Sequence, residues 1–219
     1  MNGRLRSGLT LIELTVVVAI IALLGLVAVP AFDGMFADQR VKAAARSVAD
    51  AFFLARAEAI RTGNPHLVVF QQSLGATAPI VVIDDGLPAA ANCTIDGGEV
   101  RHTAPAQDGV LWGTSAAVAN GNAAPDDPGA APANIPSGSS FTDATRSPSN
   151  PANWVLFQPD GMPRLFTPGA GVCDAVGLPG RGGGAIYLTN TRRDYVVVLS
   201  NLGTTRVHVW DPSTSGWIN

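Results

Sequence analysis

The sequence predicts an α+β protein in which one long N-terminal helix packs on an antiparallel β-sheet. Three features lead to this fold class: an apolar run over residues 9–32, an amphipathic helical pattern after it, and a series of short strand-like stretches in the rest of the chain. We expect the first half of the helix to be transmembrane and the second half to belong to a globular body. The expected parts are residues 1–8, 9–30, 31–63 and a β-rich body over 64–219.

The composition is unusually apolar for a chain of this length. Of its 219 residues, 47% are hydrophobic and 14% are charged, which indicates that apolar residues are concentrated in one segment. The length allows one domain with attachments and is sufficient to bury a core. The net charge of -3 gives no support to nucleic-acid binding through a strongly basic surface.

The apolar run over residues 9–32 contains a single charge, Glu13, and follows Arg4 and Arg6. As a helix it is long enough to cross the hydrocarbon core, and the arginines favour a cytoplasmic N-terminus. An ordinary signal peptide fits less well, because its cleavage site would lie against Pro30. A carboxylate in an apolar helix requires a partner, unless Glu13 lies near the membrane edge and reaches water or is protonated.

The run GLTLIEL over residues 8–14 resembles the prepilin signature of type IV pilin-like proteins, in which a basic leader ends in glycine. The resemblance implies cleavage after Gly8 by a membrane-embedded prepilin peptidase and N-methylation of Leu9, the new N-terminus. The family usually has phenylalanine at this position, so Leu9 departs from the pattern. In related filaments the glutamate meets the N-terminal amine of a neighbouring subunit, which gives Glu13 an assembly role. The family also tolerates a helix kink, which we expect at Pro30.

The same resemblance implies the partners and the location of the protein. The partners are other pilin or pseudopilin subunits, the prepilin peptidase and the inner membrane. The expected location is the bacterial inner membrane, crossed once with the C-terminal body in the periplasm, and afterwards a periplasmic or extracellular filament.

After Pro30 the pattern becomes that of an amphipathic helix. Apolar residues recur at intervals of three and four, which places them on one face, and the sequence GNP over residues 63–65 ends the helix. A helix of about 50 residues therefore needs a sheet to cover its apolar stripe. The stripe consists of Val41, Ala45, Val48, Phe52, Ala55 and Ala59.

The rest of the chain reads as strands joined by turns, with one long insert. Tight turns are expected at PDG over 159–161 and at NLG over 201–203. Residues 114–152 are mostly small or polar, so we expect a surface loop or a disordered insert there. The expected strands are 66–72, 80–84, 109–112, 153–158, 164–167, 185–189, 195–200 and 204–210.

Two further motifs narrow the resemblance. The stretch LARAEAIR over 54–61 and the stretch FQPDG over 157–161, together with the terminal hairpin, look like the GspH/FimT group of minor pilins and pseudopilins. The resemblance implies a structural subunit of a type II secretion pseudopilus or a type IV pilus. A third possibility is an adhesin whose insert contacts a surface.

The main alternative is a FimT-like minor pilin that binds DNA during natural transformation. Alternation along the last hairpin places Arg206, His208 and Trp210 on one face, and Arg192 and Arg193 precede the neighbouring strand. Cations with an aromatic ring could hold phosphates and stack on a base. DNA-binding relatives carry a glycine-arginine-any-arginine element where this chain reads GTTR, so only one arginine matches.

The remaining reactive residues give no sign of an enzyme, a cofactor or a metal centre. Cys93 and Cys173 lack metal-site spacing and either form a disulfide or stay as two buried thiols. No serine or cysteine is accompanied by a base in the sequence, so no catalytic residue is assigned. We expect His66, His102 and His208 to be surface strand residues, and the adjacent acids Asp84 and Asp85 to be solvated.

Overall fold

The computed structural model describes residues 10–70, 80–86, 90–104, 107–118, 122–129, 131, 135, 137–169 and 173–219. Within these, residues 27–31 and 174 are described by their backbone alone. The chain divides into two compact units, Met1–Ala37 and Asp38–Asn219. The predicted cleavage site at Gly8 and Leu9 lies outside the described residues.

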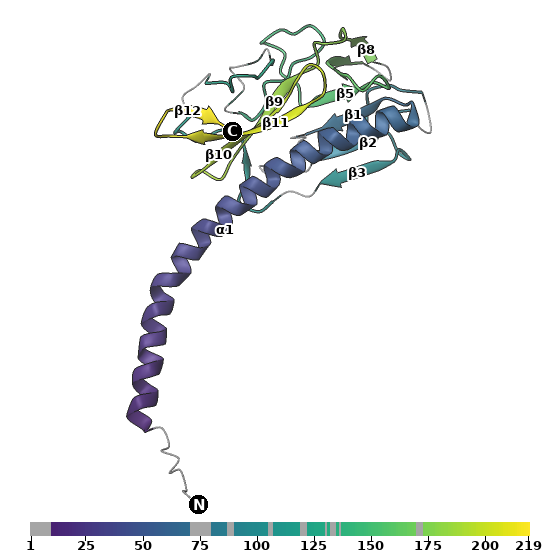
Figure 1. The fold of residues 1–219 in the computed structure, drawn as a ribbon. Helices are drawn as coiled ribbons and strands as arrows, with labels where there is room; N and C mark the ends of the chain where they lie inside the picture. The colour runs from purple at the N-terminus through teal and green to yellow at the C-terminus, as the bar shows by residue number, and fades with distance from the viewer. Residues whose placement is uncertain are drawn as a thin grey trace, which may run out of the picture. The chain divides into compact units, whose positions relative to one another are not determined.

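The long N-terminal helix is confirmed as α1, Leu11–Thr62, which has 52 residues (Figure 1). The helix assignment continues through Pro30, so proline does not end the helix, and the kink expected there stays a prediction. Gly63 ends the helix as predicted, because its φ of 74° is left-handed and its N–H donates to the Ala59 carbonyl at 3.1 Å.

The predicted inner-membrane location is contradicted. No helix in the described part of the chain is both long and apolar enough to cross a membrane. We therefore do not retain the single-pass location.

The second unit contains two five-stranded antiparallel sheets and a two-stranded one. Sheet A has the order β3-β2-β1-β5-β6 and sheet B the order β12-β11-β10-β9-β4, while β7 pairs with β8. The strands are β1 His66–Val69, β2 Ile80–Asp84, β3 Arg101–Ala104, β4 Leu111–Trp112, β5 Trp154–Phe157, β6 Pro163–Arg164, β7 Phe166–Pro168, β8 Cys173–Val176, β9 Gly184–Thr189, β10 Asp194–Leu199, β11 Thr205–Asp211 and β12 Gly216–Ile218.

The main core lies where the C-terminal part of α1 meets one face of each sheet. All six residues of the predicted apolar stripe are at most 3% exposed. They pack with Val68 and Val82 of sheet A and with Ile186 and Val197 of sheet B. Figure 1 shows this part of α1 beside β1, β2 and β3. The coarse α+β prediction is therefore confirmed, because the amphipathic helix is covered by antiparallel strands.

The sheet arrangement differs from the single sheet that was expected. Strands β3, β8 and β12 were not predicted, since each is a short stretch without a run of branched apolar residues. The stretch predicted over 164–167 is divided between β6 and β7, which belong to different sheets. These strands are created by pairing with distant partners, which local composition does not encode.

The insert over 114–152 contains no named strand or helix among its described residues, but it is not merely a surface loop. Phe141 is fully buried in the main core beside Phe52 and Phe70, with ring centroids 6.2 and 5.3 Å away. On the outer face of sheet B, Val118 and Ile135 are buried in a second cluster. A few apolar side chains in a small-residue segment are therefore enough to pack it on the body.

Candidate functional site

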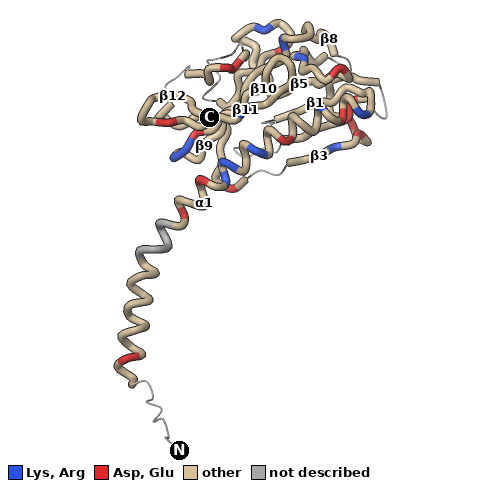
Figure 2. The backbone as a smooth tube through the Cα atoms, viewed as in Figure 1, with Lys and Arg blue, Asp and Glu red and all other residues tan. Residues whose placement is uncertain are grey.

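The N-terminal part of α1 presents apolar side chains in every direction. Within residues 11–26 every large apolar side chain is exposed, from 49% for Val17 to 81% for Leu11. In Figure 2 these turns carry one acidic position and no basic one, and the acid is Glu13. A helix that is hydrophobic all round is normally buried, so this segment, which we call the apolar segment, is unpartnered in the isolated chain.

Glu13 caps the helix to which it belongs. Its carboxylate accepts hydrogen bonds from the backbone N–H and the hydroxyl of Thr10, both at 3.2 Å. The backbone N–H of Glu13 donates back to Thr10 Oγ1 at 3.3 Å. This reciprocal pair is a capping box, whose signal in the sequence is a threonine followed three residues later by a glutamate.

Arg56, in the helix-end motif over 54–61, lies where the turns over 159–161 and 201–203 meet. Its guanidinium donates to the carbonyl of Gly203, in the β10–β11 turn, at 3.0 Å. Gly203 in turn lies so close to the carbonyl oxygen of Gly161, in the β5–β6 turn, that an added Cβ would be 2.9 Å from it. The motif at the helix end, the PDG turn and the NLG turn therefore meet at one place, which links α1 to both sheets.

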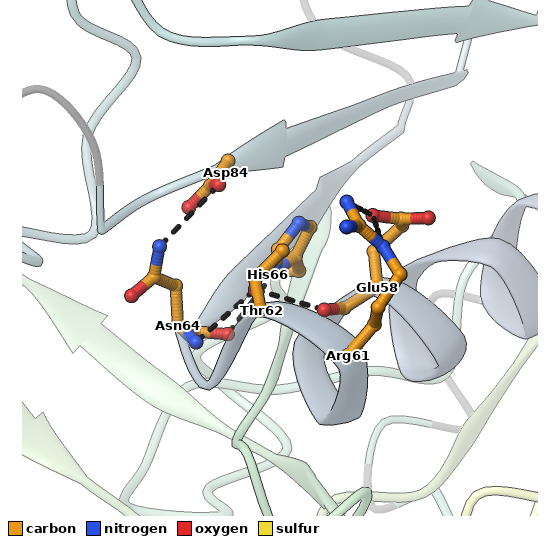
Figure 3. Close-up of polar contacts among 6 residues, drawn as sticks. All are labelled: Glu58, Arg61, Thr62, Asn64, His66 and Asp84. Carbon is orange, nitrogen blue, oxygen red and sulfur yellow. Dashed lines mark hydrogen bonds and ion pairs between the residues drawn. The ribbon is translucent and has the colours of Figure 1, made fainter.

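A second set of polar contacts connects the end of α1 to sheet A (Figure 3). Arg61 donates to the Glu58 carboxylate at 2.9 and 2.5 Å, and this bond lowers the pKa of Glu58. Asn64 donates to Asp84 at 3.5 Å, and the Asn64 carbonyl lies 3.1 Å from His66 Nδ1. The contacts of Asn64 join the end of the helix to β1 and β2. Among the residues drawn, no nucleophile is paired with a base, so the cluster supports a structural role.

Several predicted surface residues are buried. His66 and His208 are 3% and 6% exposed, whereas His102 is exposed as expected. Asp84 and Asp85 were interpreted as solvated, but they are 6% and 2% exposed. The acids remain inside because backbone N–H groups satisfy them: Gly86 donates to Asp84 at 3.1 Å, and Cys93 donates to Asp85 at 3.0 Å.

Cys93 and Cys173 form a disulfide, with Cα atoms 5.2 Å apart and 80 residues apart in sequence. Of the two alternatives left open by the sequence, the bridge is therefore the correct one. It connects the segment after β2 to the start of β8 and packs in a third cluster with Leu67 and Phe166. In the chain-entropy account, a loop of this size contributes roughly 4 to 5 kcal/mol to stability.

No model of a protein family, no curated protein and no solved structure matches this chain. The resemblance to the pilin-like proteins therefore rests on the motifs at residues 8–14, 54–61 and 157–161.

The residues considered for DNA binding do not form one accessible face. Trp210 is 4% exposed and packs edge-on against Trp217 at 5.3 Å, so it is not available to stack on a base. His208 is also buried, and Asp126 of the insert accepts from its Nε2 at 2.8 Å and from Arg206 Nη1 at 3.3 Å. The insert covers this side of β11 and supplies a carboxylate, which the strand pattern alone did not reveal.

The last two candidate cations lie toward the other end of the hairpin. Arg192 and Arg193 are exposed in the turn between β9 and β10, next to Asp211 at the end of β11. Arg206 lies at the start of β11, beside the β10–β11 turn. Arg193 also lies 3.7 Å from the Asp38 carboxylate of α1. The expected group of three arginines is therefore divided into two places, and acids accompany both.

Proposed function

We propose that this chain is a minor pilin or pseudopilin, a structural subunit of a type II secretion pseudopilus or a type IV pilus. It is assembled through its N-terminal helix after the leader is removed behind Gly8. The partners are other pilin or pseudopilin subunits, and the prepilin peptidase acts on the leader. The proposal rests on the prepilin-like run at residues 8–14 and on the group motifs.

The observation that carries the proposal is the exposed apolar segment. At about 25 cal/mol per Å², leaving eleven large apolar side chains in water is strongly unfavourable, so the segment requires cover. The exposed large side chains are Leu11, Ile12, Leu14, Val16, Val17, Val18, Ile20, Ile21, Leu23, Leu24 and Leu26. Packing against the same segment of neighbouring subunits would remove this surface from water, and it would extend into a filament when successive head-to-tail contacts do not close into a ring.

Glu13 is the residue through which assembly can be tested. Its carboxylate has two separable roles: it caps its own helix with Thr10, and it is proposed to meet the N-terminal amine of the next subunit. Glutamine at the same position can still cap, because capping boxes accept either residue, but it carries no charge. Glu13→Gln therefore removes the proposed contact, whereas Thr10→Ala weakens the cap and keeps the carboxylate.

The test is sedimentation of assembled filaments, with the subunit measured by quantitative mass spectrometry. We expect Glu13→Gln to be processed normally but to fall to about a tenth of the wild-type amount in filaments, the result of losing about 1.4 kcal/mol per contact. Thr10→Ala should assemble at close to the wild-type amount, because it keeps the Glu13 carboxylate and the cap that it weakens, worth about 1 kcal/mol, lies within one subunit rather than between two. Equal incorporation of Glu13→Gln and wild type would refute the assembly contact, and a filament subunit that still begins at Met1 would refute the whole proposal.

A further inference from the structure

A buried carboxylate lies beside the disulfide. One oxygen of Asp85 and the sulfur atoms of Cys93 and Cys173 all lie within 4.8 Å of one another. The two sulfurs are bonded to each other, so they are not thiolates that could ligate a metal. The arrangement instead places an acid next to a bond whose cleavage produces a thiolate.

Asp85 also fixes the backbone of Cys93. Its two oxygens accept the Cys93 N–H at 3.2 and 3.0 Å, and Oδ1 accepts the Asn92 N–H at 3.3 Å. Cys93 has a φ of 58°, a left-handed conformation that residues other than glycine rarely adopt. The carboxylate therefore holds the chain in the conformation that directs the Cys93 sulfur at Cys173.

The surroundings of Asp85 favour its protonated form. Burial raises the pKa of Asp85, and the N–H groups of Cys93 and Asn92 offset only part of this effect. The other charges that act on it are carboxylates: Asp96 and its neighbour Asp84. Glu99 faces it as well, because the charge of Asp85 raises the pKa of Glu99. A proton is therefore available on this side of the disulfide at higher pH than an ordinary aspartate allows.

The two cysteine residues differ in exposure. Cys93 is 4% exposed, whereas Cys173 is partly exposed at the start of β8. An external thiolate consequently reaches Cys173 more readily, which makes the Cys93 sulfur the leaving group. The leaving sulfur is the one whose backbone is bonded to Asp85.

We propose that Cys93–Cys173 is an exchangeable disulfide in which Asp85 supplies the proton to the departing Cys93 sulfur. A thiolate of an external dithiol attacks Sγ of Cys173 and forms a mixed disulfide. The bond between the two cysteines breaks, and the Cys93 sulfur leaves with the electron pair and takes the proton of Asp85.

The second thiol of the reagent completes the exchange. It loses its proton to water and attacks the reagent sulfur in the mixed disulfide, which releases Cys173 as a thiolate that water protonates. The reagent is oxidised to a disulfide, and the protein is reduced to two thiols. In reverse, the Asp85 carboxylate accepts the Cys93 proton while the bond forms. Opening the disulfide would release the loop that contains Ile95. This residue and Trp154 line an apolar pocket of about 230 Å³.

The test measures the rate at which dithiothreitol reduces the full chain from about pH 3 to about pH 8, a range that begins below the ordinary pKa of an aspartate, and divides it by the concentration of reagent thiolate. Alkylation followed by mass spectrometry counts the free thiols. For the wild type we expect the normalised rate to fall as pH rises through the ionisation of Asp85. For Asp85→Asn we expect a rate roughly 100-fold lower at the acid end, without that pH dependence.

Asp84→Asn is the matched control, because it removes the neighbouring buried acid, which bonds to Gly86 and Asn64 instead. It should leave the rate at the acid end unchanged, and because it removes a negative charge that raises the pKa of Asp85, the fall in rate should move to somewhat lower pH. The proposal is wrong if Asp85→Asn behaves like Asp84→Asn. If Asp85→Asn does not fold, the wild-type protein alone tests the proposal. A normalised reduction rate that does not change with pH would exclude proton donation by Asp85.

Discussion

At the scale of single residues, the contact of Gly203 with its neighbours shows how the helix end is locked to the sheets. Gly203 is buried with a φ of 80°, and its carbonyl accepts from Arg56 at 3.0 Å. An added Cβ would lie 2.9 Å from the backbone oxygen of Gly161, an atom that moves only with its turn. The position therefore demands glycine both for its conformation and for its surroundings.

Gly203→Ala should destabilise the chain more than the same change at Gly180. Gly180 has a similar φ of 75° but has open space around it, so Gly180→Ala carries only the left-handed penalty of about 1 to 2 kcal/mol. The overlap with Gly161 should cost Gly203→Ala about 1 to 3 kcal/mol more. Urea unfolding of both variants measures the difference, and equal losses would show that the two turns are not held together.

At the scale of elements, the insert is a component of the core. Phe141 fills the space between α1 and the sheets, and Asp127 accepts hydrogen bonds from the Tyr187 hydroxyl at 2.7 Å and from the Ser140 hydroxyl at 2.8 Å. Asp126 adds the bonds to His208 and Arg206 described above. The insert is thus fixed to β9 and β11 by a few contacts, although most of its residues are small.

Phe141→Ala should lower the free energy of unfolding by about 3 to 5 kcal/mol, the usual cost of emptying a buried aromatic site. The control is Phe53→Ala on α1, which deletes the same atoms from a side chain that is 71% exposed and should change stability by about 0.5 kcal/mol or less. Chemical denaturation of both variants provides the comparison. If the two variants lost the same stability, the insert would be a dispensable loop, as the sequence had suggested.

At the scale of the whole molecule, ionisation of buried acids links stability to pH. Burial raises the pKa of Asp127, and its bonds to Tyr187, Gly129 and Ser140 offset this in part. The pKa of Asp85 is raised in the same way. A group with a raised pKa binds its proton more tightly in the folded state, so stability falls as pH rises from the ordinary value of 3.8 through the folded pKa.

We therefore expect the free energy of unfolding to fall as pH rises above about 4, and to fall less in Asp127→Asn. Asparagine does not titrate, and its one amide oxygen can still accept from Ser140 and Gly129, although it no longer accepts from the Tyr187 hydroxyl. The control is Asp211→Asn: bonds from Ser213 lower the pKa of this acid, so it acts below pH 3.8 and with the opposite sign. Urea unfolding over a pH series measures these slopes. If the free energy of unfolding changed with pH as steeply in Asp127→Asn as in the wild type, Asp127 would not contribute to the pH dependence.

The sequence by itself determined the long helix, its apolar stripe and its end at Gly63, because helical periodicity and a glycine stop are local signals. It also located most strands and both tight turns. The apolar segment and its single acid can also be recognised in the sequence, and the proposed assembly role of Glu13 depends on them. Each of these features depends on a short stretch of consecutive residues and not on contacts with residues far away in the sequence.

The tertiary structure alone decided which residues are covered. It divided the strands between two sheets, buried Phe141 and Trp210, and brought Arg56 to the two turns, because such contacts join residues far apart in the chain. It also placed Asp85 beside the disulfide, where acids expected in solvent are held by backbone N–H groups. Whether a residue is buried depends on what packs against it. The small-residue composition of the insert gives no indication that the insert packs on sheet B.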